Sequence, residues 1–169
     1  ELLLYLLLIL ISSFFSLKKT PTISPQLFFL VWLSLYIMFV LTIRQVFDAD
    51  IGNYAKSMEL DKVSIYYLKE PVIWISQQLL YQVFNSSFVV FLICDIIIGV
   101  ALFYALKKNN LPQYAYFSFL TFFPVILGMQ NIYRQFYAEV FVLLSLGSLK
   151  SATNSTRSIL IFLLAVLSH

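Results

Sequence analysis

Four ionisable side chains lie inside or at the edges of long apolar stretches, where charge is costly: Arg44, Asp95, Arg134 and Glu139. An ionised group at the centre of a membrane helix costs about 2.5–3.5 kcal/mol on insertion scales, so each one needs a partner or a function. Arg134 and Glu139 are five residues apart, which places them about 140° apart on a helix, too far around to pair. Arg134 therefore needs another partner, and an anionic ligand is one candidate.

Two of these groups have structural alternatives to a role in chemistry. Arg44 follows directly after an apolar stretch, so it is either an interfacial anchor or a ligand-binding cation. Asp95 lies near the middle of another stretch, so it is either a buried hydrogen-bonding group or a catalytic one. Gln135 and Glu139 are four residues apart and share one helix face. From the residues alone, both interpretations stay open for Arg44 and for Asp95.

Several common kinds of catalytic site are absent from the sequence. Cys94 is the only cysteine, which excludes an intrachain disulfide and a cysteine-rich metal site. The sequence contains no phosphate-binding Gly-rich loop, no dinucleotide-binding glycine pattern, no zinc motif and no nucleophile elbow. We therefore expect no nucleotide chemistry of the soluble type, no metal centre, no cofactor and no nucleic acid partner.

The composition predicts the elements that position these residues. Hydrophobic residues make up 61% of the 169 residues and charged residues only 11%, and the mean hydropathy is +0.89. A soluble domain of this size needs more charge to cover its surface. Because the apolar residues also come in long blocks, we expect an all-α, polytopic transmembrane helical bundle in the lipid bilayer.

Six apolar stretches mark the predicted spans: residues 2–17, 27–43, 88–106, 114–129, 132–149 and 158–169. A signal peptide is the alternative for the first stretch, but its basic residues would precede the apolar core rather than follow it. The last stretch holds only about 12 residues, too few to cross roughly 30 Å of hydrocarbon. We therefore expect about five full spans and a truncated sixth, in a single transmembrane domain that is the N-terminal half of a larger one.

The connections between these stretches separate by charge. Alternate connections carry the cations Lys18, Lys19, Lys107, Lys108, Lys150 and Arg157 and no acid. The other side holds most of the carboxylates, including Asp50 and Glu70. By the positive-inside rule, the lysine-bearing connections are predicted to be cytoplasmic and the N-terminus external.

The long external segment, residues 44–87, has two different halves. Its first half is polar and rich in charge and tyrosine, and its second half predicts an amphipathic helix over residues 72–84 that starts after Pro71. The apolar face of that helix holds Ile75, Leu79 and Val83, and Gln77 is among the residues of the other face. The helix is too short and polar to span, so we place it in the external membrane interface, with a partly re-entrant course as the alternative.

Four short motifs in this order resemble the EpsG family of bacterial membrane proteins, which is similar to the Wzy-type polymerases of O-antigen and exopolysaccharide. Arg44, Asp50 and Tyr54 form R-x5-D-x3-Y after the second span, and Glu70-Pro71 precedes the amphipathic helix. Arg134-Gln135 with Ala138 opens a later span, and His169 lies in the next. The family's Gly-Thr before the aspartate is replaced by Asp48-Ala49, and an aromatic residue is replaced by Gln45.

The resemblance implies a glycosyltransferase that polymerises polyprenyl-diphosphate-linked oligosaccharide repeat units on the outer face of the bacterial cytoplasmic (inner) membrane. The residues implied to bind the diphosphate and glycan are Arg44, Tyr54, Arg134 and Gln135. The residues implied to act in catalysis, as candidate bases for the acceptor hydroxyl, are Asp50, Glu70 and His169. A chain-length regulator and a flippase are the implied protein partners, and no metal is required.

Two other functions use the same residues. A transporter or flippase would bind a lipid-linked or anionic substrate with the arginines and use Asp95 and Glu139 as proton or cation sites. A non-catalytic membrane partner in polysaccharide export would tolerate substitution of either arginine. Inverted repeats and Gly- or Pro-broken pairs of spans, which are typical of transporters, are not visible in the sequence.

Overall fold

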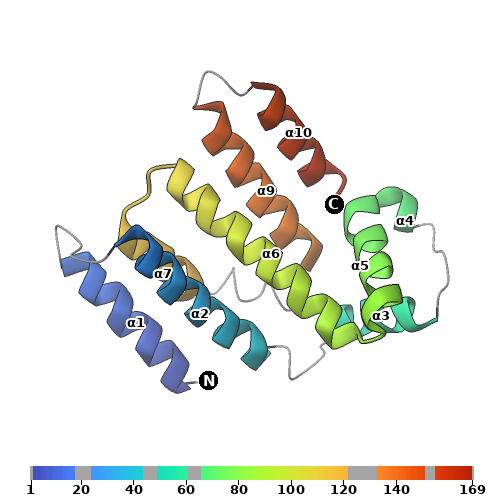
Figure 1. Cartoon of the computed structure of the whole chain (residues 1–169), viewed down its shortest axis with the longest axis horizontal. Helices are drawn as coiled ribbons and strands as arrows, with labels where there is room; N and C mark the ends of the chain where they lie inside the picture. Colours follow the sequence, from blue (N-terminus) through green and yellow to red (C-terminus); the bar gives the residue numbers. More distant parts are fainter. Residues whose placement is uncertain are drawn as a thin grey trace.

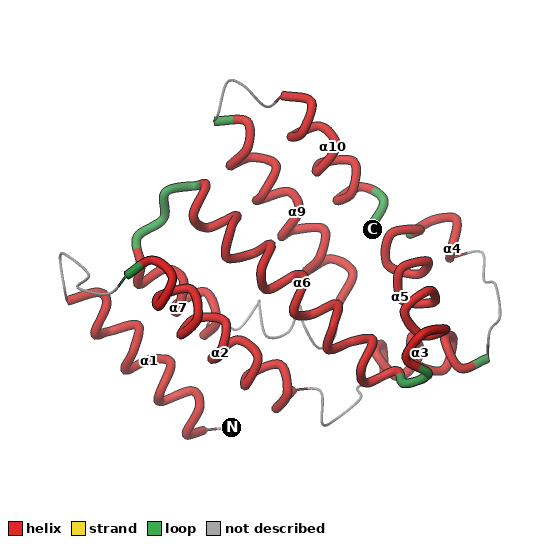
Figure 2. The backbone as a smooth tube through the Cα atoms, viewed as in Figure 1, coloured by secondary structure: helices red, strands yellow, loops and turns green. Residues whose placement is uncertain are grey.

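The computed structural model describes residues 2–17, 24–43, 49–60, 66–121, 133–150 and 155–168. Every regular element in these residues is an α-helix, which confirms the all-α part of the predicted fold class (Figures 1 and 2). The helices are α1 (Leu2–Leu17), α2 (Pro25–Ile43), α3 (Ala49–Glu59), α4 (Tyr66–Lys69), α5 (Pro71–Phe84), α6 (Ser87–Lys108), α7 (Gln113–Thr121), α9 (Tyr133–Leu149) and α10 (Ser155–Val166).

Helix α6 is the centre of the bundle. It packs against α2 on one side and against α9 on the other, and α10 packs on the outer side of α9 (Figure 1). Its sequence is apolar except for the buried Asp95 until Lys107, and the Ser86 side chain caps its start by accepting from the Val89 backbone N–H at 3.5 Å. Helices α3 and α5 contact its first half. These two helices therefore lie at the end of the bundle where α6 begins.

Helix α2 runs antiparallel to α6 through an aromatic interface. The ring of Phe28, near the start of α2, lies 6.0 Å from that of Phe103, near the end of α6. Further along α2, the Tyr36 ring is so close to Gly99 that an added Cβ would lie 2.4 Å from it. Helix α2 therefore ends at the same end of the bundle at which α6 begins.

The predicted cations gather at the opposite end of the bundle. The Lys108 amine donates to the Ser148 hydroxyl at 2.8 Å, which places the last turns of α6 and α9 together. Ser145 and Ser158 each donate a side-chain hydrogen bond to the other's carbonyl, at 2.9 and 2.6 Å, which joins the end of α9 to the start of α10. The cations at this end are Lys107, Lys108, Lys150 and Arg157.

The five predicted full spans are supported in part. Within the described residues, the helices long and apolar enough to cross a membrane are α2, over Pro25–Thr42, and α6. Helix α1 has 16 residues and α9 has 17, fewer than the roughly 20 that a typical span uses. The predicted span at 114–129 extends beyond α7 into residues outside the described part. Membrane crossing by α1, by α9 and by the stretch 114–129 therefore stays a prediction.

The outer helices carry an apolar surface. Large side chains on α1 and α10 are more than half exposed: Leu3, Leu10, Ile159 and Leu160. Exposed apolar surfaces of this kind face lipid or another protein segment rather than water. It agrees with the membrane environment that the composition predicts.

The segment between α2 and α6 contains more helix than the sequence analysis expected. Helix α5 occupies the predicted amphipathic stretch, with Pro71 in its first turn and the left-handed Asn85 (φ 48°) ending it. Its apolar stripe faces outward, since Ile75, Leu79 and Val83 are 47%, 58% and 74% exposed. Gln77, on the predicted polar side, is buried. Helix α5 thus buries one polar side chain beside Ile73 and Trp74, while Gln82 and part of its apolar face are exposed.

Candidate functional site

Glu70 connects α5 and α9 at the end of the bundle where α6 begins. It lies at the N-cap position of α5 and is 6% exposed. Its Oε1 accepts a hydrogen bond from Nη1 of Arg134, with which it forms an ion pair. Its Oε2 accepts from the indole Nε1 of Trp74 at 3.2 Å. One carboxylate therefore holds the first turn of α9 and the first turn of α5 together.

The local sequence explains this geometry. Pro71 at the first helical position starts α5 directly after Glu70, and Trp74 follows Glu70 by four residues, so its indole reaches back by one turn. Arg134 is the second residue of α9, and its side chain is 36% exposed. The arginine therefore both pairs with Glu70 and reaches the surface of the protein.

Tyr54 joins the site through an aromatic contact. Its ring centroid lies 4.5 Å from that of Trp74, with 31° between the ring planes. Tyr54 is 2% exposed and lies on the buried side of α3 with Ile51 and Met58. The contact fixes α3 against α5, next to the Glu70–Arg134 pair.

Three further predicted residues, Asp50, Arg44 and His169, lie wholly or by their side chains outside the described part. Asp50 lies in the first turn of α3, four residues before Tyr54, but its side chain is outside the described part. Arg44 and His169 are also outside it. Arg44 directly follows α2, which ends at this end of the bundle. The carbonyl of Leu167, two residues before His169, accepts from the Val72 backbone N–H at 3.3 Å, beside Glu70.

Comparison with known proteins gives the family. No curated protein and no solved structure matches the chain, but the model of the EpsG family matches residues 27–169. The chain belongs to the EpsG family. The match confirms the resemblance drawn from the short motifs, and it contains every predicted site residue from Arg44 to His169. Membership is consistent with a membrane protein of polysaccharide polymerisation.

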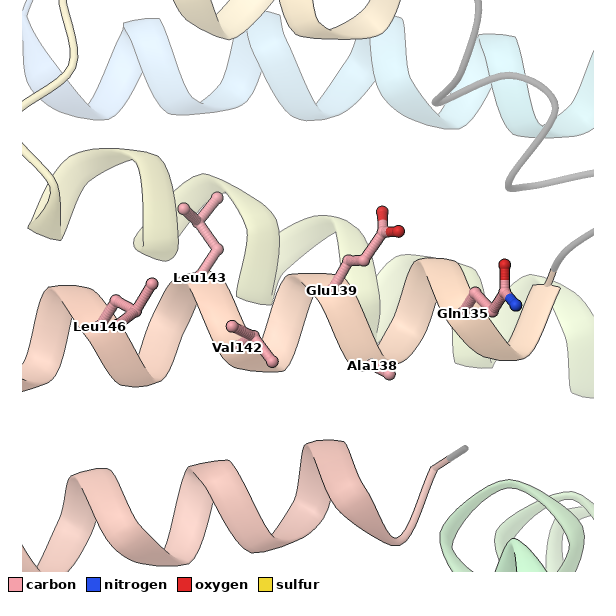
Figure 3. Close-up of a pocket in the computed structure, with 6 residues that line it drawn as sticks. All are labelled: Gln135, Ala138, Glu139, Val142, Leu143 and Leu146. Carbon is pink, nitrogen blue, oxygen red and sulfur yellow. The ribbon is translucent and has the colours of Figure 1, made fainter.

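Gln135 lies apart from the ion pair of this EpsG-family chain. It is exposed and lines an open groove of about 410 Å³ along α9 with Ala138, Glu139, Val142, Leu143 and Leu146. Figure 3 shows the amide of Gln135 and the carboxylate of Glu139 pointing to the same side of α9. Gln135 and Glu139 therefore share one face of α9, as their spacing of four residues predicted. The groove combines apolar side chains with a polar end formed by Gln135 and Glu139.

Asp95 is separate from the candidate site of the EpsG-family chain. It is completely buried in α6, and its Oδ1 accepts from the Tyr137 hydroxyl of α9 at 3.0 Å. This contact favours the structural interpretation of Asp95, because it cross-links the two helices at the centre of the bundle. It does not support a proton or cation site that is open to a transported ligand.

Trp74 and Gln77 were not among the predicted site residues of this EpsG-family chain. Trp74 and Gln77 follow Glu70 by four and seven residues, and this spacing puts all three on one face of α5. All three are buried. Their spacing from Glu70 was the sequence feature that could have predicted their shared face.

Proposed function

We propose that this EpsG-family protein is a polysaccharide polymerase. It transfers a glycan from its polyprenyl-diphosphate carrier to another lipid-linked repeat unit, on the outer face of the bacterial cytoplasmic membrane. The observation that carries the proposal is the Glu70–Arg134 pair, which orients a partly exposed guanidinium at the end of the bundle away from the lysines. The family match supports the class of reaction.

The chemistry needs a cation at this position. When the oxygen of the acceptor hydroxyl attacks the anomeric carbon, the bond from that carbon to the diphosphate breaks and the diphosphate leaves with the electron pair. Its negative charge therefore grows in the transition state. A guanidinium suits this task, because its planar fork binds two phosphate oxygens at once and stays charged. Arg44, which follows α2 at the same end of the bundle, supplies a second cation.

The roles of the three candidate bases differ in this proposal. Glu70 accepts hydrogen bonds from Arg134 and Trp74 through both of its oxygens, so it acts as the positioning residue of the arginine. The base that takes the proton of the acceptor hydroxyl is then Asp50 or His169. Tyr54 and Trp74 form the wall beside the ion pair. The diphosphate is already an adequate leaving group, so the step needs no metal.

The polyprenyl tail has a matching surface in this proposal. The groove along α9 is apolar from Val142 to Leu146, and its other end holds Gln135 and Glu139, near the start of the helix that carries Arg134. A diphosphate at Arg134 would let its hydrocarbon tail lie along this groove, toward the centre of the membrane.

The test is a glycan ladder assay in a deletion host that carries the full-length gene. We expect Arg134→Ala to lower the polymerisation rate by about 100-fold, because a transition-state contact to the departing diphosphate is lost. The glycan ladder should therefore become much shorter. Arg44→Ala should act in the same direction. Arg157→Ala, at the other end of the bundle, is the matched control and should leave the ladder unchanged. Normal ladders for both Arg44→Ala and Arg134→Ala, at wild-type protein levels, would exclude the diphosphate clamp.

A further inference from the structure

Gln77 is a buried amide with no partner among the described residues. Its side chain is 1% exposed, and neither its Oε1 nor its Nε2 makes a hydrogen bond there. An unpaired donor and acceptor inside a protein lower its stability. Such a group in a natural protein needs an explanation, and a bound ligand or an ordered water is the usual one. Gln77 therefore points to something that the protein binds.

The position of Gln77 links it to the candidate site. Glu70, Trp74 and Gln77 are spaced at i, i+4 and i+7, so they form one continuous face of α5. Gln77 lies about 10 Å along the helix axis from Glu70, at about 1.5 Å per residue. Trp74 lies between them, with its indole bonded to Glu70 and its ring against Tyr54. The face thus leads from the ion pair at one end to the unpaired amide at the other.

The chemistry of the amide restricts the ligand. A primary amide offers two N–H donors and a carbonyl acceptor, and a sugar hydroxyl or N-acetyl group both donates and accepts. A phosphate only accepts, and a hydrocarbon tail does neither. A ligand that reaches Gln77 from a phosphate beside the Glu70–Arg134 pair spans about 10 Å along α5, which suits an oligosaccharide rather than a single anion.

We propose that Gln77 is a specificity-determining residue that binds a hydroxyl or amide group of the glycan whose diphosphate is held at Arg134. This inference rests on the proposed polymerase function and adds a glycan-binding subsite to it. A buried water that merely satisfies the amide is the competing occupant.

The variant that tests the subsite is Gln77→Met, which keeps an unbranched side chain of similar length and removes the amide. The control is Gln82→Met, because Gln82 lies on the same helix but is exposed. The purified full-length protein is heated alone, with undecaprenyl diphosphate, and with lipid-linked repeat units extracted from the deletion host. The melting temperature is recorded in each case, and the glycan ladder is recorded in cells.

We expect Gln77→Met to melt at a higher temperature than wild type without ligand, because the unpaired amide is gone. It should keep the rise in melting temperature caused by undecaprenyl diphosphate. It should lose the additional rise caused by the glycan, with about tenfold weaker binding of the lipid-linked unit and a shorter ladder. Gln82→Met should match wild type in every measurement.

Two results would overturn the subsite alone. One is an additional glycan-dependent rise in Gln77→Met equal to that of wild type, with a normal ladder. The other is loss of folded protein in both Gln77→Met and the shorter, branched Gln77→Leu, because the amide would then be needed by the fold itself. If wild type gains nothing from the glycan over undecaprenyl diphosphate, the polymerase proposal fails, and the subsite fails with it.

Discussion

At the scale of single residues, Glu70 has the densest set of connections in the candidate site. It is the N-cap of α5, the ion-pair partner of Arg134 and the acceptor for Trp74. The resemblance implied a catalytic carboxylate at this position, and in the proposed function its contacts to Arg134 and Trp74 make it the residue that orients the arginine. The need of Arg134 for a partner was also foreseen, because Glu139 is on the wrong side of its helix. That the partner would come from Glu70 was not predictable, since it depends on how α5 packs near α9.

The ion pair makes a measurable contribution to stability. We expect Glu70→Gln to lower the free energy of unfolding by about 1–2 kcal/mol, because the carboxylate is buried while the arginine is partly exposed. In Arg134→Ala protein, the same substitution should cost clearly less. A double-mutant cycle with Glu70→Gln, Arg134→Ala and both together measures this coupling by unfolding of the full-length protein. Glu59→Gln, at an exposed position of α3, is the control. A coupling energy of zero would contradict the ion pair.

Asp95 provides a prediction that separates the polymerase from the transporter. We expect Tyr137→Phe to destabilise the protein by about 1–3 kcal/mol, because it leaves a buried acceptor without its donor. Asp95→Asn should likewise affect stability while leaving polymer length per folded molecule unchanged. The measurements are melting temperature and a glycan ladder normalised to protein level. Loss of substrate uptake in Asp95→Asn with a normal ladder would support the transporter instead.

At the scale of elements, the long apolar helices and the amphipathic α5 were predictable, while α3 and α4 were not. The apolar blocks predicted α1, α2, α6 and α9 to within two residues at each end, because continuous apolar runs bounded by charge are typical of membrane helices. Helix α3 was expected to be part of a polar segment. Its buried stripe of Ile51, Tyr54, Ala55 and Met58 was present in the sequence. That stripe forms a helix by packing against α5 and α6, and such tertiary stabilisation is not visible in local propensity.

The crossing of α2 and α6 at Gly99 is a sensitive contact. A methyl group there would lie 2.4–2.9 Å from atoms of the Tyr36 ring, so we expect Gly99→Ala to destabilise the bundle by about 1–3 kcal/mol. Gly52→Ala is the matched control, because a Cβ at that helical position would have no neighbour within 4 Å. It should be neutral or stabilising by up to about 1 kcal/mol. Equal melting temperatures of the two variants would show that the helices do not approach so closely.

At the scale of the whole molecule, the charges of the sequence predicted two distinct ends. The structure places Lys107, Lys108, Lys150 and Arg157 at one end, and Glu70 and Arg134 at the other. The order of helices across the bundle was not predictable. Helix α1 packs against α7 rather than mainly against its neighbour in sequence, and side-chain fit decides such pairings.

The orientation of the bundle in the membrane is testable by cysteine labelling. In a Cys94→Ala background, we expect Glu59→Cys to react with a membrane-impermeant thiol reagent in intact spheroplasts. Asn110→Cys should react only after permeabilisation, because it follows the lysines that end α6. Both positions are exposed in the structure, so burial does not explain a difference between them. The reverse labelling pattern would contradict an external Glu70–Arg134 site.

The Glu70–Arg134 pair also has a consequence for the unoccupied protein. Because the carboxylate already neutralises the guanidinium, the resting site presents little net positive charge to its surroundings. To bind Arg134, free phosphate would have to weaken the Glu70–Arg134 ion pair, and it would gain only one new contact in return. A lipid-linked substrate brings a second phosphate, a long hydrocarbon chain and a glycan, so many contacts offset the same loss. In the proposed polymerase, the pair would therefore disfavour small anions and favour a ligand that binds at several places at once.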